Sequence, residues 1–171
     1  MSTAHIYDHM LNVLKGWPAP FALDKAADLS SDETNAIQQG MVMYLDANGH
    51  FRLGLACGKI PHLAVRGTAF VDTRQSEGNM MGGTLSGIVC LGPYEVQTTE
   101  YDSDQAYAPN DALTAVNTGA NIGLVTRGTV YEDTILGWVS DGVVTGLYEQ
   151  SILTFWTDFV HPLTCASSPA A

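Results

Sequence analysis

The chain has 171 residues, of which 46% are hydrophobic, and it carries 7 basic against 18 acidic side chains, a formal net charge of −11. This length and apolar content suffice for one domain with a buried core and argue against disorder. Because affinity for a phosphate backbone comes from lysine and arginine, the excess of acids excludes nucleic acid as the expected partner.

The charges are unevenly distributed along the chain. Residues 1–75 hold six basic and seven acidic side chains, whereas the remainder holds eleven acids and Arg127 as its single basic residue. The second half therefore presents a negative field, which suits solvation or contact with a basic protein surface.

Residues 1–38 are expected to form an N-terminal arm. Ile6, Met10, Val13 and Trp17 recur at helical spacing, so this part fits a short helix, but the same residues fit an extended arm equally well. The following GWPAPFAL alternates prolines with apolar residues, which favours an extended path. Such an arm either lies on a neighbouring molecule or packs back on its own domain.

The chain is expected to be made and kept soluble in a cytoplasm. Its start, MSTAHIYDHM, lacks the basic and apolar regions of a signal peptide. A run of about 18 apolar residues, the minimum for a membrane span, is absent from the sequence.

Residues 39–171 are predicted to form an all-β domain, either a β-barrel or a compact β-sandwich. Glycine is abundant at 17 residues, and short runs rich in valine, threonine and tyrosine alternate with turn signals. Asn48-Gly49 lies between two apolar runs and predicts a tight hairpin. Strands are expected near 41–46, 50–56, 63–71, 84–91, 93–99, 112–116, 121–126, 134–140 and 147–157, with a long exposed loop at 72–83.

The sequence predicts no catalytic, cofactor or metal site. His5 and His9 lie four residues apart but lack the glutamate of a zinc protease and a third ligand. His50, His62 and His161 are expected in loops. Further patterns are incomplete: Ser86 misses the nucleophile elbow by one position, Lys59 is not part of a P-loop, and the Asp46 to Gly49 segment has too few calcium ligands.

One acidic stretch, TTEYDSDQAYAPNDALTAV at 98–116, raises the question of an active site. Glu100, Asp102 and Asp104 alternate, so in an extended chain they would share a face and could hold calcium or act as acid and base. The preferred interpretation is a solvated loop that turns at Pro109 to Asp111 into the next strand.

The chain has three cysteines, an odd number, and they lack CxxC spacing and have small or apolar neighbours: Cys57, Cys90 and Cys165. They are expected to be buried free thiols, not a disulfide framework.

The segments YEVQTTEYD, YAPNDALTAV, IGLVTRGT, ILGWVSDGV and LTFWTDFVHP together resemble the small β-barrel capsid cement (decoration) proteins of tailed bacteriophages. The likeness is best over residues 92–160, and the NVLKGWPAPFAL and GMVMYLDANGHFRLG segments extend it. It implies a structural protein, not an enzyme, bound in many copies as a homodimer or homotrimer. Its partner would be the phage major capsid protein, and its place the outer surface of the virion capsid.

Two other functions are alternatives: a β-rich carbohydrate-binding module, and a small acid/base hydrolase using Glu100 with Asp102 or Asp104. Trp138 and Trp156 are expected to serve the barrel core. Aromatic and methionine side chains on irregular segments are typical interface anchors. The residues expected to contact the capsid or a second subunit are Trp17, Pro18, Pro20, Phe21, Met80, Met81, Tyr101 and Tyr107.

Overall fold

The computed structural model describes residues 10–15, 24–28, 37–65, 84–90, 92–130, 132–146 and 149–160. All regular elements in these ranges are β-strands, which confirms the all-β prediction. They are β1 (Leu11–Lys15), β2 (Asp24–Asp28), β3 (Val42–Leu45), β4 (Phe51–Leu53), β5 (His62–Ala64), β6 (Thr84–Val89), β7 (Tyr94–Thr98), β8 (Ala112–Ala115), β9 (Val125–Arg127), β10 (Ile135–Thr145) and β11 (Ser151–Val160).

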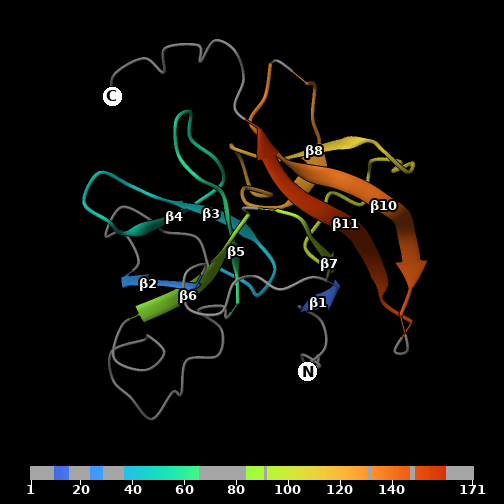
Figure 1. Ribbon diagram of the computed structural model, residues 1–171, viewed down its shortest axis with the longest axis horizontal. Helices are drawn as coiled ribbons and strands as arrows, with labels where there is room; N and C mark the ends of the chain where they lie inside the picture. The colour runs from blue at the N-terminus through green and yellow to red at the C-terminus, as the bar shows by residue number, and fades with distance from the viewer. Residues whose placement is uncertain are drawn as a thin grey trace.

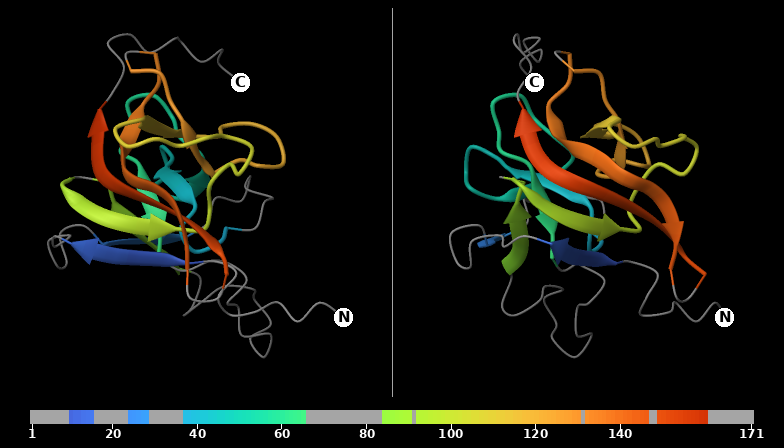
Figure 2. Two further views of the ribbon diagram at one scale, coloured as in Figure 1. Left: turned by 90° about the vertical axis from the view of Figure 1, so that its right-hand side faces the viewer. Right: turned by 45° about the vertical axis from the view of Figure 1, so that its right-hand side comes forward.

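The strands form two antiparallel sheets, which lie toward opposite sides of the view in Figure 1. Sheet A has the order β1-β7-β11-β10-β8-β9, and sheet B has the order β2-β6-β5-β3-β4. The long β10–β11 hairpin dominates sheet A and curves across the molecule in both views of Figure 2. The N-terminal segment thus contributes one edge strand to each sheet, β1 to sheet A and β2 to sheet B.

Sheet A bends back on itself beyond β9. The backbone N–H of Val125 donates to the carbonyl of Glu100 at 2.9 Å, and that of Asp102 donates to the carbonyl of Val125 at 2.8 Å. These bonds join β9 to the segment that follows β7 through a parallel bridge between Tyr101 and Val125. The sheet therefore closes through its own chain at this edge, which leaves β1 as its open edge among the described residues.

The main core lies between the two sheets. Sheet A contributes side chains such as Tyr94, Val96 and Phe155, and sheet B contributes Val42 and Leu63, all of them buried. A second cluster, on the other face of sheet B, contains Ile37, Met43, Phe51, Leu53 and Ala64. Sheet B is therefore apolar on both faces, as strands of a small sandwich or barrel must be when both faces are covered.

The hairpin predicted at Asn48-Gly49 is confirmed. β3 and β4 pair on either side of it, and Gly49 has a φ of 80°. Asp46 stabilises the turn, because its Oδ1 accepts the backbone N–H groups of Asn48 at 2.8 Å and His50 at 2.9 Å. The carboxylate that suggested a calcium loop is thus committed to an Asx-type turn.

The helical interpretation of the N-terminal segment is wrong for residues 11–15, which form β1 and pair with β7. Backbone pairing with a preformed strand outweighs the weak helical spacing of a few apolar residues. Residues 11–15 are therefore extended, as the other interpretation of this segment predicted. They pack on their own domain and not on a neighbouring molecule.

Two further expectations need correction. His62 is not in a loop: it begins β5, is 4% exposed, and its ring packs edge-on against Phe51 at 5.4 Å. Cys57 is not a buried free thiol, since it lies exposed in the turn after β4 and is disulfide-bonded. Cys90 does match the expectation as a buried free thiol, whereas Cys165 lies outside the described residues.

Candidate functional site

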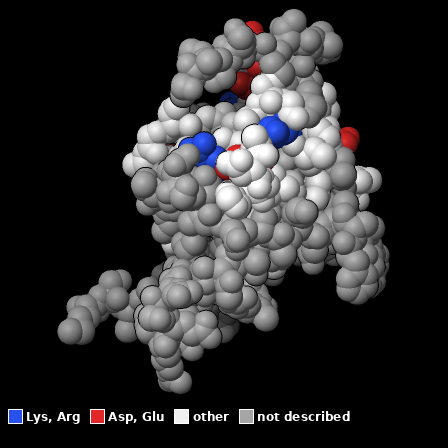
Figure 3. Space-filling model, turned by 90° about the vertical axis from the view of Figure 1, so that its left-hand side faces the viewer, with Lys and Arg blue, Asp and Glu red and all other residues white. Residues whose placement is uncertain are grey.

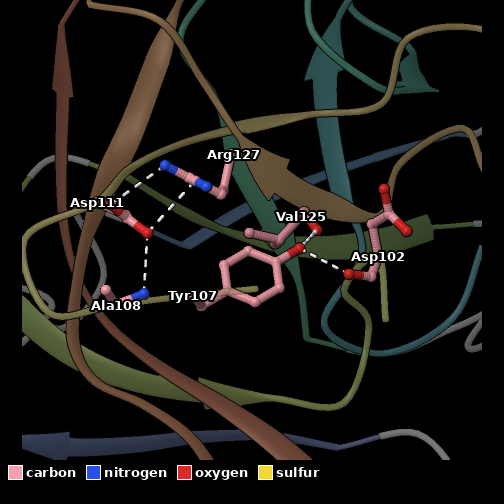
Figure 4. Close-up of polar contacts among 6 residues, drawn as sticks. All are labelled: Asp102, Tyr107, Ala108, Asp111, Val125 and Arg127. Carbon is pink, nitrogen blue, oxygen red and sulfur yellow. Dashed lines mark hydrogen bonds and ion pairs between the residues drawn. The ribbon is translucent and has the colours of Figure 1, made fainter. Parts of the chain in front are cut away.

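The acidic stretch singled out in the sequence folds into a loop held by its own tyrosine. The Tyr107 hydroxyl donates to the carbonyl of Asp102 at 2.8 Å and lies 3.3 Å from the carbonyl of Val125 (Figure 4). Its ring contacts that of Tyr101 edge-to-face, with centroids 5.6 Å apart. Burial raises the pKa of Tyr107 to about 12. The phenol therefore ties the loop to β9.

The three alternating acids of this stretch do not gather on one face. Glu100 is 6% exposed at the end of β7, whereas Asp102 is half-buried and Asp104 is exposed. Asp102 Oδ1 accepts the backbone N–H of Asp104 at 3.1 Å, so its charge stabilises the turn. Nowhere in the described ranges do three His, Cys, Asp or Glu side chains meet in a way that could hold a metal ion.

The end of the same loop is fixed by Asp111. One of its oxygens, Oδ2, accepts the Ala108 N–H at 2.8 Å and lies 3.3 Å from Nε of Arg127 on β9 (Figure 4). Arg127 is half exposed, so this ion pair adds little beyond positioning the turn. The single basic residue of the acidic half is thus used to hold the loop.

Of the eight residues predicted to contact the capsid or a second subunit, the structure describes two, Tyr101 and Tyr107. Tyr101 is 8% exposed and belongs to the main core, and Tyr107 is partly buried and packs against it. Both rings therefore point inward from the loop, and whether either touches a partner stays a prediction. Trp17, Pro18, Pro20, Phe21, Met80 and Met81 lie outside the described residues, as do His5, His9 and His161.

The two tryptophans assigned to the core lie instead on the outer face of sheet A. Gly137 and Phe155 face the core, so strand alternation turns their neighbours Trp138 and Trp156 outward, where both are partly exposed. Trp138 on β10 and Trp156 on β11 are direct cross-strand partners. The prediction that they serve the core was wrong because a period-2 pattern fixes the face only when its register is known.

These tryptophans belong to one row of side chains that crosses five strands. The register pairs Lys15 with Glu95, Glu95 with Trp156, Trp156 with Trp138, and Trp138 with Ala112. We call this set the tryptophan row. Sequence reasoning missed it because its members lie up to 141 positions apart and only sheet register brings them together.

Glu95 is the most buried member of the row. Its side chain is 3% exposed, yet its Oε1 accepts the Ser140 hydroxyl at 2.7 Å and its Oε2 lies 3.0 Å from Nζ of Lys15. Burial by itself raises the pKa of Glu95, but the Ser140 hydrogen bond and the Lys15 charge outweigh it and hold the pKa below its ordinary value. The same Nζ lies 5.9 Å from the Trp156 ring centroid, within cation–π range.

A bulge in β10 allows Ser140 to reach Glu95. The register between β10 and β11 shifts between Val139 and Gly142, where Gly142 has a φ of 79°. The sequence predicted that the strand ends near residue 140, but the bulge lets it continue to Thr145. Ser140 and Asp141 are the unpaired residues of this bulge, and the Ser140 hydroxyl donates to Glu95.

The second exposed feature is the open edge of sheet A. The register between β1 and β7 shifts between Val13 and Lys15, which makes Leu14 a bulged residue. The Val13 side chain is 39% exposed and that of Leu14 is 46% exposed. We call Val13 and Leu14 the apolar edge.

The side of the molecule drawn in Figure 3, which lies to the left in Figure 1, has a different character. Its described surface is mostly uncharged, with a few basic and acidic groups. Ile60, in the turn before β5, is 41% exposed. Ile60 thus offers an exposed aliphatic side chain outside sheet A with which the apolar edge can be compared.

No family model matches the chain, and neither a curated protein nor a solved structure is found to be similar to it. The described part also contains no helix long and apolar enough to cross a membrane.

Proposed function

We propose that this protein is a structural cement protein, which binds the outer surface of a tailed-phage capsid and stabilises the shell by joining neighbouring capsomers. Support comes from the likeness of residues 92–160 to such proteins and from the all-β fold. The main support is the apolar edge, because Val13 and Leu14 expose aliphatic side chains on β1, the edge strand of sheet A that no other described residue covers by pairing.

The bulge at Leu14 decides how such an edge would be used. An open flat strand invites further strands and aggregation, whereas a bulge next to a lysine blocks continuous pairing. β1 has both features, the register shift after Val13 and Lys15 at its end. The edge therefore suits docking of side chains into an apolar pocket on the shell, not extension of the sheet into a fibre.

The charge of the chain fits the same place. A net charge of −11 keeps a protein in solution and away from packaged DNA, and it favours contact with basic patches of the major capsid protein. A modest interface per subunit is enough, because a dimer or trimer bridging capsomers gains affinity from linkage. A closed oligomer on a local two-fold or three-fold axis of the shell would meet this need.

The test has two parts. Quantitative mass spectrometry of gradient-purified virions should find this chain in a fixed ratio to the major capsid protein, at hundreds of copies per particle. Absence or a handful of copies would refute the proposal.

The second part localises the contact. Leu14→Ser should weaken binding to purified shells by about tenfold or more. Ile60→Ser serves as the matched control, since it removes a similarly exposed aliphatic side chain from the turn before β5, outside sheet A. Equal binding by both variants and the wild type would remove the apolar edge from the interface.

A further inference from the structure

We propose that the tryptophan row is a binding site for a neutral saccharide. This inference goes beyond the proposed function and uses different residues, because the apolar edge lies on β1 whereas the tryptophans lie on β10 and β11. It assigns to the protein a ligand-binding activity in addition to its structural one.

The first argument is the aromatic platform. Trp138 and Trp156 are direct partners on adjacent antiparallel strands, which brings their Cβ atoms to within about 5.5 Å of each other. Beyond Trp138 the row continues with Ala112, a small side chain that is 9% exposed. Two neighbouring partly exposed indoles offer flat apolar area at low cost in conformational entropy, as stacking on the C–H face of a sugar ring requires.

The second argument is the set of polar groups beside the platform. On one flank Glu95 holds Ser140 and Lys15 in fixed positions through contacts of 2.7 and 3.0 Å. The next outward row contains Asn12 paired with Gln97 and Gln97 paired with Thr154. The groups with exposed surface are the Asn12 and Gln97 amides, the Ser140 hydroxyl and the Lys15 ammonium, which match the donors and acceptors of sugar hydroxyls. Glu95 and Thr154 are buried and serve to hold these groups.

The hydrogen bonds between these groups make the site preorganised. Gln97 Nε2 donates to Thr154 Oγ1 at 3.3 Å, and Glu95 accepts from Ser140, so the side chains already have defined orientations without ligand. Preorganisation reduces the entropy lost on binding. A buried carboxylate in such a network is expensive to maintain and adds no packing that an apolar side chain would not supply.

The chemistry of the neighbours decides between a saccharide and a protein partner. The core of a protein interface is depleted in charge and rich in apolar side chains. Around the indoles the two outward rows contain only polar side chains apart from Ala112, whereas the exposed aliphatic residues Val143 and Val160 belong to other positions of β10 and β11. Amphipathic hydroxyl-bearing ligands fit this mixture better than an aliphatic surface does.

The charge of the row indicates which saccharides would bind. Lys15 and Glu95 neutralise each other within the row. Asp141 and Asp158 are exposed on the two tryptophan-bearing strands and would repel sialic or uronic acids. The expected ligand is therefore a neutral oligosaccharide.

The experiment uses the full chain and four soluble probes, maltohexaose, cellohexaose, mannohexaose and chitohexaose. Isothermal titration calorimetry should detect binding of at least one probe with a dissociation constant in the micromolar to low millimolar range. Trp138→Ala and Trp156→Ala should each weaken it about tenfold or more, and Gln97→Ala should weaken it less. Absence of binding to all four probes at millimolar concentration overturns the proposal.

Matched variants separate folding from binding. Trp138→Leu keeps an apolar side chain but removes the flat ring, so it should also lose binding while its melting temperature stays near that of the wild type. Tyr107→Phe, an aromatic change away from the row, should bind the probe as the wild type does. Full binding by the doubly substituted Trp138→Leu, Trp156→Leu protein overturns the proposal.

Binding of the same variants to capsid shells distinguishes the saccharide site from the proposed capsid contact. Leu14→Ser should reduce binding to shells and leave saccharide binding intact, and the tryptophan variants should do the opposite. If the tryptophan variants lose shell binding and none of the probes binds, the row is a protein-docking surface and the saccharide proposal is wrong. If saccharide binding holds but virions lack the protein, only the cement function fails.

Discussion

Glu95 on β7 and Lys15 on β1 form an ion pair in which one partner is buried and the other is not. Their Oε2 and Nζ atoms lie 3.0 Å apart, and the side chains are 3% and 68% exposed. Removing a buried charge's partner is costly, whereas an exposed lysine by itself contributes little. The pair therefore stabilises the docking of β1 mainly by satisfying a carboxylate that the sheet has already buried.

Replacing Lys15 with methionine should lower the free energy of unfolding at pH 7 by about 1 kcal/mol. Glu95→Gln, which keeps the shape and can still accept from Ser140, removes the charge that needs a partner. In the double variant the lysine change should therefore have almost no further effect. Urea denaturation of the four proteins measures the coupling, and strict additivity would contradict the assigned role of the pair.

The same pair predicts a response to acid. The folded-state pKa of Glu95 lies below its ordinary value, so its contribution to stability is present above about pH 4.5 and is lost as the pH falls through the lower folded-state pKa. The stability difference between the wild type and Lys15→Met should shrink in the same range. Urea midpoints measured from pH 7 down to pH 3 test this, and a constant difference would exclude the linkage.

Gly137 should tolerate no side chain. A Cβ atom there would collide with the backbone carbonyl of Trp156 and approach Phe155 Cδ2 at 3.0 Å. Because a carbonyl in a paired strand cannot move alone, Gly137→Ala should cost about 2 kcal/mol or more and lower the melting temperature by about 4 °C or more.

Gly146 supplies the control for this substitution. A Cβ atom there would meet the flexible ends of the Ile152 and Gln150 side chains, which can rotate away. Gly146→Ala should therefore change the melting temperature much less than Gly137→Ala. Similar losses in the two variants, measured by differential scanning calorimetry, would show that the collision at Gly137 is relieved easily.

Much of this fold is predictable from local pattern. Asn48-Gly49 predicts a hairpin because glycine readily adopts the positive φ that hairpin turns need, and Gly49 does so at the end of the turn that begins at Asp46. The runs at β6, β7 and β8 also appear near their observed positions, since each combines β-branched residues with flanking turn signals.

The candidate sites were not predictable, for a physical reason. Lys15, Glu95, Trp156 and Trp138 become neighbours only through the register of four strands, which nothing local in the sequence specifies. The bulge at Ser140 likewise reads as a turn, because Ser-Asp-Gly is typical of one. Val13 fits a helical spacing in the sequence, but the chain there pairs with β7 as an extended strand, and the register shift after Val13 leaves Leu14 as a bulged residue.

Cys90 should be inert in the folded protein. Its thiol is completely buried between the sheets, and burial raises its pKa well above the ordinary value, so the reactive thiolate is suppressed. Iodoacetamide at pH 8 should leave Cys90 unmodified in native protein and alkylate it fully in 6 M guanidinium chloride, as peptide mass spectrometry would show. Rapid native labelling would contradict its place in the core.

Tyr107 should make the protein sensitive to alkali. Its folded-state pKa of about 12 exceeds the ordinary 10.0, chiefly through burial, so its contribution to stability is complete below about pH 10 and is lost as the pH rises toward 12. Tyr107→Phe removes both hydroxyl contacts and should cost about 1 kcal/mol at pH 7. The variant should lose less stability than the wild type between pH 10 and 12, so the two urea midpoints should converge there. Parallel curves across this range would mean that the phenol ionises as freely in the folded protein as in the unfolded chain, and that Tyr107 does not hold the acidic loop on β9.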